Sequence, residues 1–100
     1  MQDETVSQAT VMSADGDLTS ARLPALRLRL REMVASGVQS LTLDLSGTEM
    51  VDSAGIGLLI SAHNSLKKTG GALTVIHASQ DVLELFRTMR IHQHFCVSGN

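Results

Sequence analysis

Apolar residues recur along the chain with two different periods, and the change from one period to the other predicts the order of the secondary structure. β-Branched content, alternation or a short apolar run predicts strands at residues 5–13, 41–45, 72–76 and 95–97. Apolar residues three and four positions apart predict helices at residues 20–36, 54–68 and 80–89. The chain therefore alternates strand and helix throughout.

This alternation predicts an α/β fold, because strands joined through a helix by short connections run parallel. We expect a mixed, mostly parallel β-sheet with helices packed against it. The length of 100 residues is enough for one domain over residues 1–100, with a core at about 5–97 and short frayed ends.

Individual positions on the two longer predicted helices carry further expectations. Pro24 falls in the first turn of its helix, where the missing N–H costs little, and Leu28 lies opposite the apolar stripe, so it is expected to be exposed. On the next helix, His63 falls on the apolar stripe, which favours a partly buried, hydrogen-bonded histidine over a catalytic one. Leu58 is expected to point away from that stripe.

Composition excludes several classes of function. A net charge of −2, with two Phe and no Trp or Tyr, disfavours binding to nucleic acid. Cys96 is the only cysteine, so no internal disulfide is possible, and the histidines lack the spacing of a zinc site. The polar start does not resemble a signal peptide, and no run approaches the roughly 18 apolar residues of a membrane span. We expect a cytoplasmic protein without membrane insertion or cofactor.

The segment from Met50 to Leu59 combines small, polar and apolar residues at the start of a predicted helix. Ser53 is expected at the N-cap, where its hydroxyl accepts a backbone hydrogen bond. Gly55 and Gly57 are poor residues for a helix interior, so they need a steric reason. Their lack of side chains either lets a partner approach the Ser53 hydroxyl, which we favour, or relieves crowding against a neighbouring strand.

Residues 52–57, Asp-Ser-Ala-Gly-Ile-Gly, resemble the Asp-Ser-x-Gly-x-Gly signature of STAS domains of the bacterial anti-sigma factor antagonist type. Further segments are similar to the same family: the Gly16–Thr19 turn, the Lys68–Gly71 turn and the last helix at Asp81–Phe86. The resemblance extends over roughly residues 9–95 and implies a STAS-like fold.

The resemblance also implies a phosphorylation switch. In such proteins the serine after the aspartate, here Ser53, is phosphorylated by a serine kinase that is also the anti-sigma factor, and a serine phosphatase restores it. The unphosphorylated form binds the anti-sigma factor and so releases a sigma factor. The partner-binding surface implied by the family is made by Asp17, Thr19, Asp52, Ser53, Gly55, Gly57 and Leu58.

Two departures and two alternatives qualify this interpretation. Thr19 stands where family members often carry an acid, which leaves the identity of the kinase open, and Ala54 removes a second hydroxyl from the motif. A STAS domain can instead regulate a lipid-transport ATPase or a chemosensory or two-component pathway. An enzyme with Ser53 as nucleophile is disfavoured because Val51 replaces the first glycine of a hydrolase elbow.

Overall fold

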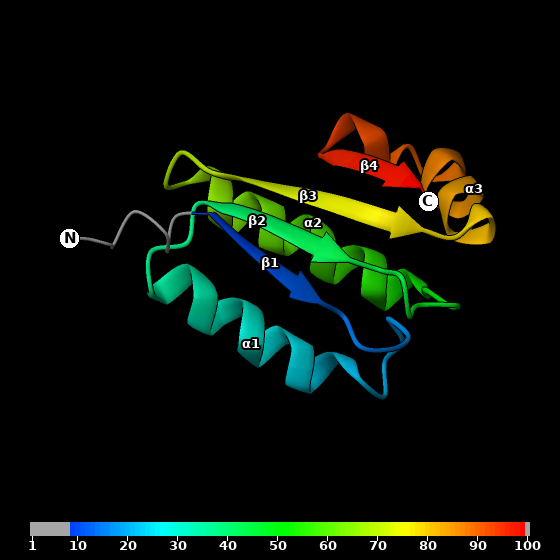
Figure 1. Ribbon diagram of the computed structural model, residues 1–100, viewed down its shortest axis with the longest axis horizontal. Coiled ribbons are helices and arrows are strands. Elements are labelled where there is room, and N and C mark those ends of the chain that lie inside the picture. The colour runs from blue at the N-terminus through cyan, green and yellow to red at the C-terminus, as the bar shows by residue number, and fades with distance from the viewer. Residues whose placement is uncertain (1–8, 100) are drawn as a thin grey trace.

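The computed structural model describes residues 9–99, which form four strands and three helices in strict alternation (Figure 1). Their bounds are β1 (Ala9–Ser13), α1 (Leu23–Ala35), β2 (Ser40–Asp44), α2 (Ser53–Lys67), β3 (Ala72–Ala78), α3 (Gln80–Thr88) and β4 (Cys96–Gly99). A short 3-10 helix, Ile91–Gln93, precedes β4. All seven predicted elements are present with small shifts at their ends, although residues 5–8 of the first predicted strand lie outside the described part of the chain.

The four strands form one sheet in the order β1-β2-β3-β4, and every neighbouring pair is parallel. Val11, Thr42, Thr74 and Cys96 lie in one row across the sheet. The predicted α/β class is confirmed, but the sheet over residues 9–99 is parallel throughout and not mixed. The reason is that each successive pair of strands is joined by a helical crossover, which reverses the chain between them.

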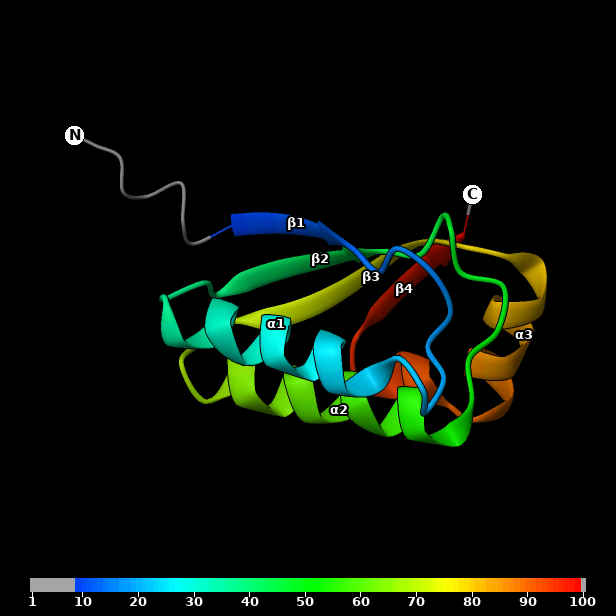
Figure 2. The ribbon, with the colours of Figure 1, turned by 90° about the horizontal axis from the view of Figure 1, so that it is seen from below.

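The helices α1 and α2 cover one face of the sheet, whereas α3 packs at the end near β4 (Figure 2). The strands show this one-sided burial directly, because Leu41 and Leu43 of β2 are buried while Thr42 and Asp44 between them are half-buried. Within the described residues, no helix lies over the opposite face (Figure 2).

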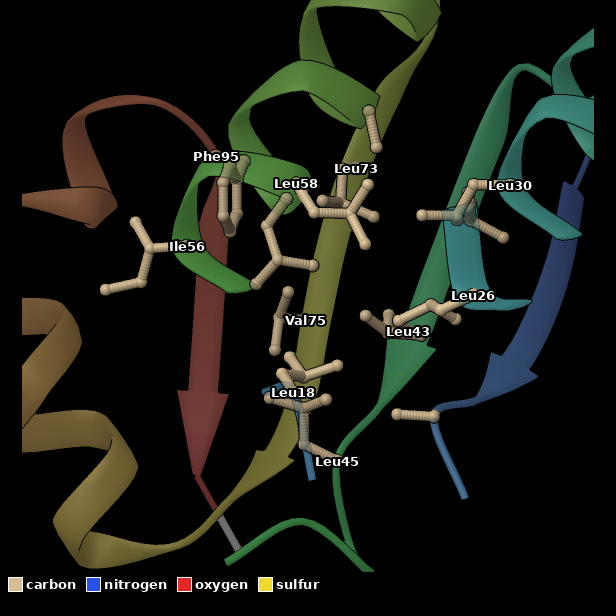
Figure 3. Close-up of a cluster of buried hydrophobic side chains, with 14 of the residues drawn as sticks. Leu18, Leu26, Leu30, Leu43, Leu45, Ile56, Leu58, Leu73, Val75 and Phe95 are labelled. Atoms are coloured by element: carbon tan, nitrogen blue, oxygen red, sulfur yellow. The ribbon is translucent and has the colours of Figure 1, made fainter. Parts of the chain in front are cut away.

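The core between the sheet and its helices is almost entirely aliphatic (Figure 3). Leu58 is one of its members, with 5% of its surface exposed, so the expectation that it points away from the core was wrong. Its position on α2 faces α1 as well as the sheet, and the sequence pattern of α2 alone could not show this second neighbour. Leu28, in contrast, is 58% exposed as predicted.

His63 has the structural role that its position predicted. Its Nδ1 accepts a hydrogen bond from the backbone N–H of Leu73 in β3 at 3.3 Å, and its ring packs against the ring of Phe95. Partial burial lowers the pKa of His63, and the positive charge of Lys67 acts in the same direction. A neutral imidazole can accept this hydrogen bond and join α2 to β3.

Candidate functional site

The Ser53 region is formed by two loops at the carboxyl ends of β1 and β2, which lie side by side because the strands are parallel (Figure 2). The loops are joined like strands of a sheet at Leu18 and Val51. The Leu18 N–H donates to the Met50 carbonyl at 2.9 Å, and the Asp52 N–H donates to the Leu18 carbonyl at 3.1 Å. Leu18 is completely buried, so this pairing holds the start of α2 against the core.

Asp17 fixes the conformation of the second loop. Its Oδ1 accepts hydrogen bonds from the backbone N–H groups of Glu49 at 2.9 Å and Met50 at 3.1 Å. These bonds hold the pKa of Asp17 below its usual value, because they stabilise the ionised carboxylate. The nearby Thr48 hydroxyl, 3% exposed, donates to the Gly16 carbonyl at 2.7 Å. Asp17 therefore helps to position the backbone of the predicted partner surface through its hydrogen bonds.

Asp52 is the N-cap of α2, so the expectation that Ser53 caps this helix was wrong. Its Oδ1 accepts from the Gly55 N–H at 2.9 Å, and its Oδ2 accepts from the Ser20 N–H at 3.0 Å and the Ser20 hydroxyl at 3.2 Å. The Gly55 and Ser20 amides lower the pKa of Asp52. One carboxylate thus caps the helix and binds the first loop, a double role for which a serine hydroxyl is too short.

Ser53 is the first residue of α2, and its side chain is exposed. The hydrogen bonds that hold the two loops are made by Asp17, Thr48 and Asp52, and none of these bonds uses the Ser53 hydroxyl. Because neighbouring groups already support the junction, Ser53 can be modified without removing a bond on which the junction depends.

The two glycines of the motif have different environments. A Cβ on Gly55 would collide with the carbonyl oxygen of Leu18, so this glycine allows close packing of the two loops. A Cβ on Gly57 would have no neighbour within 4 Å, and this residue is exposed on the same side of α2 as Ser53, one turn later. The access that the sequence suggested for both glycines is therefore available only at Gly57.

The remaining predicted contact residues are divided between surface and core. Thr19 is half-buried in the first loop and can reach the surface, whereas Leu58 is buried against α1 and contributes nothing to the surface around Ser53. The structure adds Met50, which is 63% exposed beside the Ser53 junction. Its signal in the sequence was an apolar residue in an otherwise polar turn, directly before the motif.

Within residues 9–99, no three His, Cys, Asp or Glu side chains are arranged to hold a metal ion. No helix of the described chain has the length and apolar character needed to cross a membrane. The site consists of an exposed hydroxyl, a capping carboxylate and the exposed Met50 side chain beside them.

A family model described as "Mlab, STAS domain" matches residues 1–97. The chain belongs to the STAS family. No curated protein matches this STAS chain.

Several solved structures share its fold. The unphosphorylated form of the anti-sigma factor antagonist SpoIIAA is 16% identical, with a TM-score of 0.79 over 95% of this chain and 84% of that one. A candidate anti-sigma factor antagonist from Thermotoga maritima is 14% identical, with a TM-score of 0.86 over 93% of this chain and 80% of that one. The phosphorylated Bacillus cell fate determinant SpoIIAA is 16% identical, with a TM-score of 0.71 over 95% of this chain and 86% of that one. At these identities the likeness establishes the fold.

Proposed function

We propose that this STAS protein is an anti-sigma factor antagonist that works in the cytoplasm by binding and not by catalysis. Its unphosphorylated form binds an anti-sigma factor that is also a serine kinase, and thereby releases a sigma factor. Phosphorylation of Ser53 ends this binding, and a serine phosphatase restores it. The observation that carries the proposal is the exposed Ser53 hydroxyl at the first residue of α2, on a surface that other side chains hold in place.

The local electrostatics explain how the modification would act. A phosphate adds about −1.5 to −2 charges and three acceptor oxygens, and the N-terminus of a helix accommodates such a group. Asp17 and Asp52 are already ionised nearby, since backbone N–H groups lower the pKa of both carboxyls. The modified surface would therefore become strongly anionic without a change of fold, and a partner complementary to the neutral hydroxyl would be repelled.

The contact surface we propose consists of Ser53, Thr19, Met50 and Gly57. Met50 contributes the largest exposed apolar side chain of the region, and Gly57 leaves the turn after Ser53 flat. Asp17, Asp52 and Gly55 act through the positions of these residues, because their polar atoms or backbone are occupied within the junction.

Phosphorylation by a serine kinase captured from the native cell extract with the unphosphorylated protein tests the site directly. With ATP, the wild-type protein should gain the mass of one phosphate, and Ser53→Ala should gain none. Ser40→Ala is the matched control, since Ser40 is an exposed serine at the start of β2, at the other end of the sheet from Ser53, and it should be phosphorylated like the wild type. Unchanged phosphorylation of Ser53→Ala would remove the assignment.

Binding to the same kinase tests the switch. Ser53→Asp should weaken the complex measured by calorimetry, while its free energy of unfolding stays within about 1 kcal/mol of the wild type, because an acid in the first turn suits the helix dipole. Equal affinity of both proteins would show that charge at Ser53 is not the signal. A wild-type complex that contains a transport ATPase or a chemosensory protein, and no anti-sigma factor, would favour the alternative regulatory role.

A further inference from the structure

A groove of about 330 Å³ runs between α1 and α2, away from the Ser53 junction. From α1 it is lined by Arg27, Leu30, Arg31 and Val34, which are spaced i, i+3, i+4 and i+7. Leu30 is buried in the floor, Val34 is half-buried, and the two arginines are exposed along the rim. This spacing places all four residues on one face of the helix.

The second helix repeats this spacing. Leu58, Ser61, Ala62 and Ser65 of α2 also line the groove at i, i+3, i+4 and i+7. Leu58 and Ala62 are buried in the floor, while Ser61 is exposed and Ser65 half-buried on the second rim. Two helices side by side that each present such a face form the type of surface into which a third helix packs (Figure 2).

The arginines around α1 differ in what they bind. Arg22 donates to the carbonyls of Asp17 and Ala14, and Arg29 pairs with Asp15 at 3.7 Å and donates to the Ser13 carbonyl. These two side chains are therefore used within the fold.

Arg27 and Arg31, the two arginines of the groove, form no ion pair with residues 9–99. The residues lining the groove include no carboxylate. In a protein with a net charge of −2, the groove is thus a local basic surface with an apolar floor.

We propose that this groove binds an acidic amphipathic helix of a partner protein. The apolar side of the helix packs on the floor at Leu30, Leu58 and Ala62, and its carboxylates pair with Arg27 and Arg31. Ser61 and Ser65 offer hydroxyls on the opposite rim.

A helix suits the groove better than a nucleic acid or a membrane surface does. Nucleic acid binding relies on several cations and on stacking side chains, and the chain has no Trp or Tyr. An anionic membrane is a flat surface, whereas the repeated i, i+3, i+4, i+7 spacing on both helices matches a rod-shaped ligand. This second surface is separate from the Ser53 surface, because the first residue of α2 that lines the groove, Leu58, lies five residues after Ser53, about 7.5 Å further along the helix axis and about 140° around it.

The probe for this proposal is a synthetic helical peptide of about 18 residues, or about five turns, with leucines on one face and glutamates flanking them. We expect it to bind the full chain in a fluorescence anisotropy titration. Its binding should shift backbone amide NMR signals of residues 27–35 and 58–65. Reversing both charges in Arg27→Glu/Arg31→Glu should weaken binding at least about tenfold, because attraction becomes repulsion. The same peptide should bind Ser53→Asp like the wild type.

Lys68→Glu/Arg87→Glu is the matched control, since it makes the same change of net charge at exposed residues outside the groove and should bind like the wild type. Circular dichroism melts verify that all variants are folded. The proposal is overturned if the peptide fails to bind, if both double variants bind it equally, or if a peptide with lysines in place of glutamates binds as well. Binding of the wild type to phosphatidylglycerol vesicles instead of the peptide, lost in Arg27→Glu/Arg31→Glu, would assign the groove to a membrane.

Discussion

Asp52 shows how one side chain can determine the geometry of a site that another residue serves. Its two carboxylate oxygens are both used, one by the Gly55 amide of α2 and one by the amide and hydroxyl of Ser20. The sequence pattern located the junction to within one residue but placed the helix cap at Ser53 instead of Asp52. Aspartate and serine cap helices about equally well, so local preference could not decide between them. The bond to Ser20, 32 residues away, was not visible in the sequence.

Replacing this carboxylate should loosen both loops. Asp52→Ala loses the helix cap and the bond to Ser20, and we expect its melting temperature to fall by several degrees. Asp52→Asn keeps one acceptor oxygen for the Gly55 N–H, but its NH2 group cannot accept from the Ser20 N–H and can only donate to the Ser20 hydroxyl, so it should recover part of that loss. Melts followed by circular dichroism compare the three proteins. A melting temperature of Asp52→Ala equal to the wild-type value would show that the two bonds contribute little.

At the scale of elements, α2 contains one glycine, Gly55, that close packing requires, and a second, Gly57, that has no neighbour within 4 Å. The alternation of strands and helices followed from the two hydrophobic periods, because each period reflects which side of an element meets the core. Leu58 departed from the pattern because α2 packs on α1 as well as on the sheet. The parallel direction of every pair in the described sheet followed from the helical crossovers, but the one-sided placement of α1 and α2 depends on contacts between distant segments.

Substitutions at the two glycines of α2 form a matched pair that tests whether their environments differ. Gly55→Ala introduces a Cβ against the backbone of Leu18 and should lower the free energy of unfolding by about 1–3 kcal/mol. Gly57→Ala meets no neighbour and should raise it by about 0.5–1 kcal/mol, because alanine suits a helix interior better than glycine. Urea denaturation measures both values. Similar losses in both variants would contradict the different environments described for the two positions.

For the whole molecule, three carboxylates at the carboxyl ends of the strands determine the response to acid. The pKa values of Asp17, Asp44 and Asp52 all lie below the usual value, mainly through backbone N–H bonds. Asp44 accepts from the Ser46 amide and lies 3.1 Å from the His77 ring. All three help to position the loops around Ser53, so stability and the shape of the proposed switch surface depend on the same ionised groups.

The free energy of unfolding should therefore decrease as the pH falls into the acid range. Because the pKa of each group is lower in the folded chain, its contribution is complete above the unfolded value of about 3.9 and is lost as pH falls through the lower folded values. Denaturation at pH 7, 5, 4 and 3 should show the main loss below about pH 4. Asp17→Asn/Asp52→Asn should flatten this part of the profile, with Glu49→Gln, an exposed carboxylate of the same loop, as the control. An equally steep profile in the double variant would refute the assignment.

The sheet with helices on one face also bears on how such chains diverge. Along β2, Leu41 and Leu43 are buried in the interior, while Thr42 between them is half-buried. Evolution can replace every second strand residue without disturbing the interior. A chain can thus differ from the solved antagonists at most positions, with 14–16% identity, and still have the same fold.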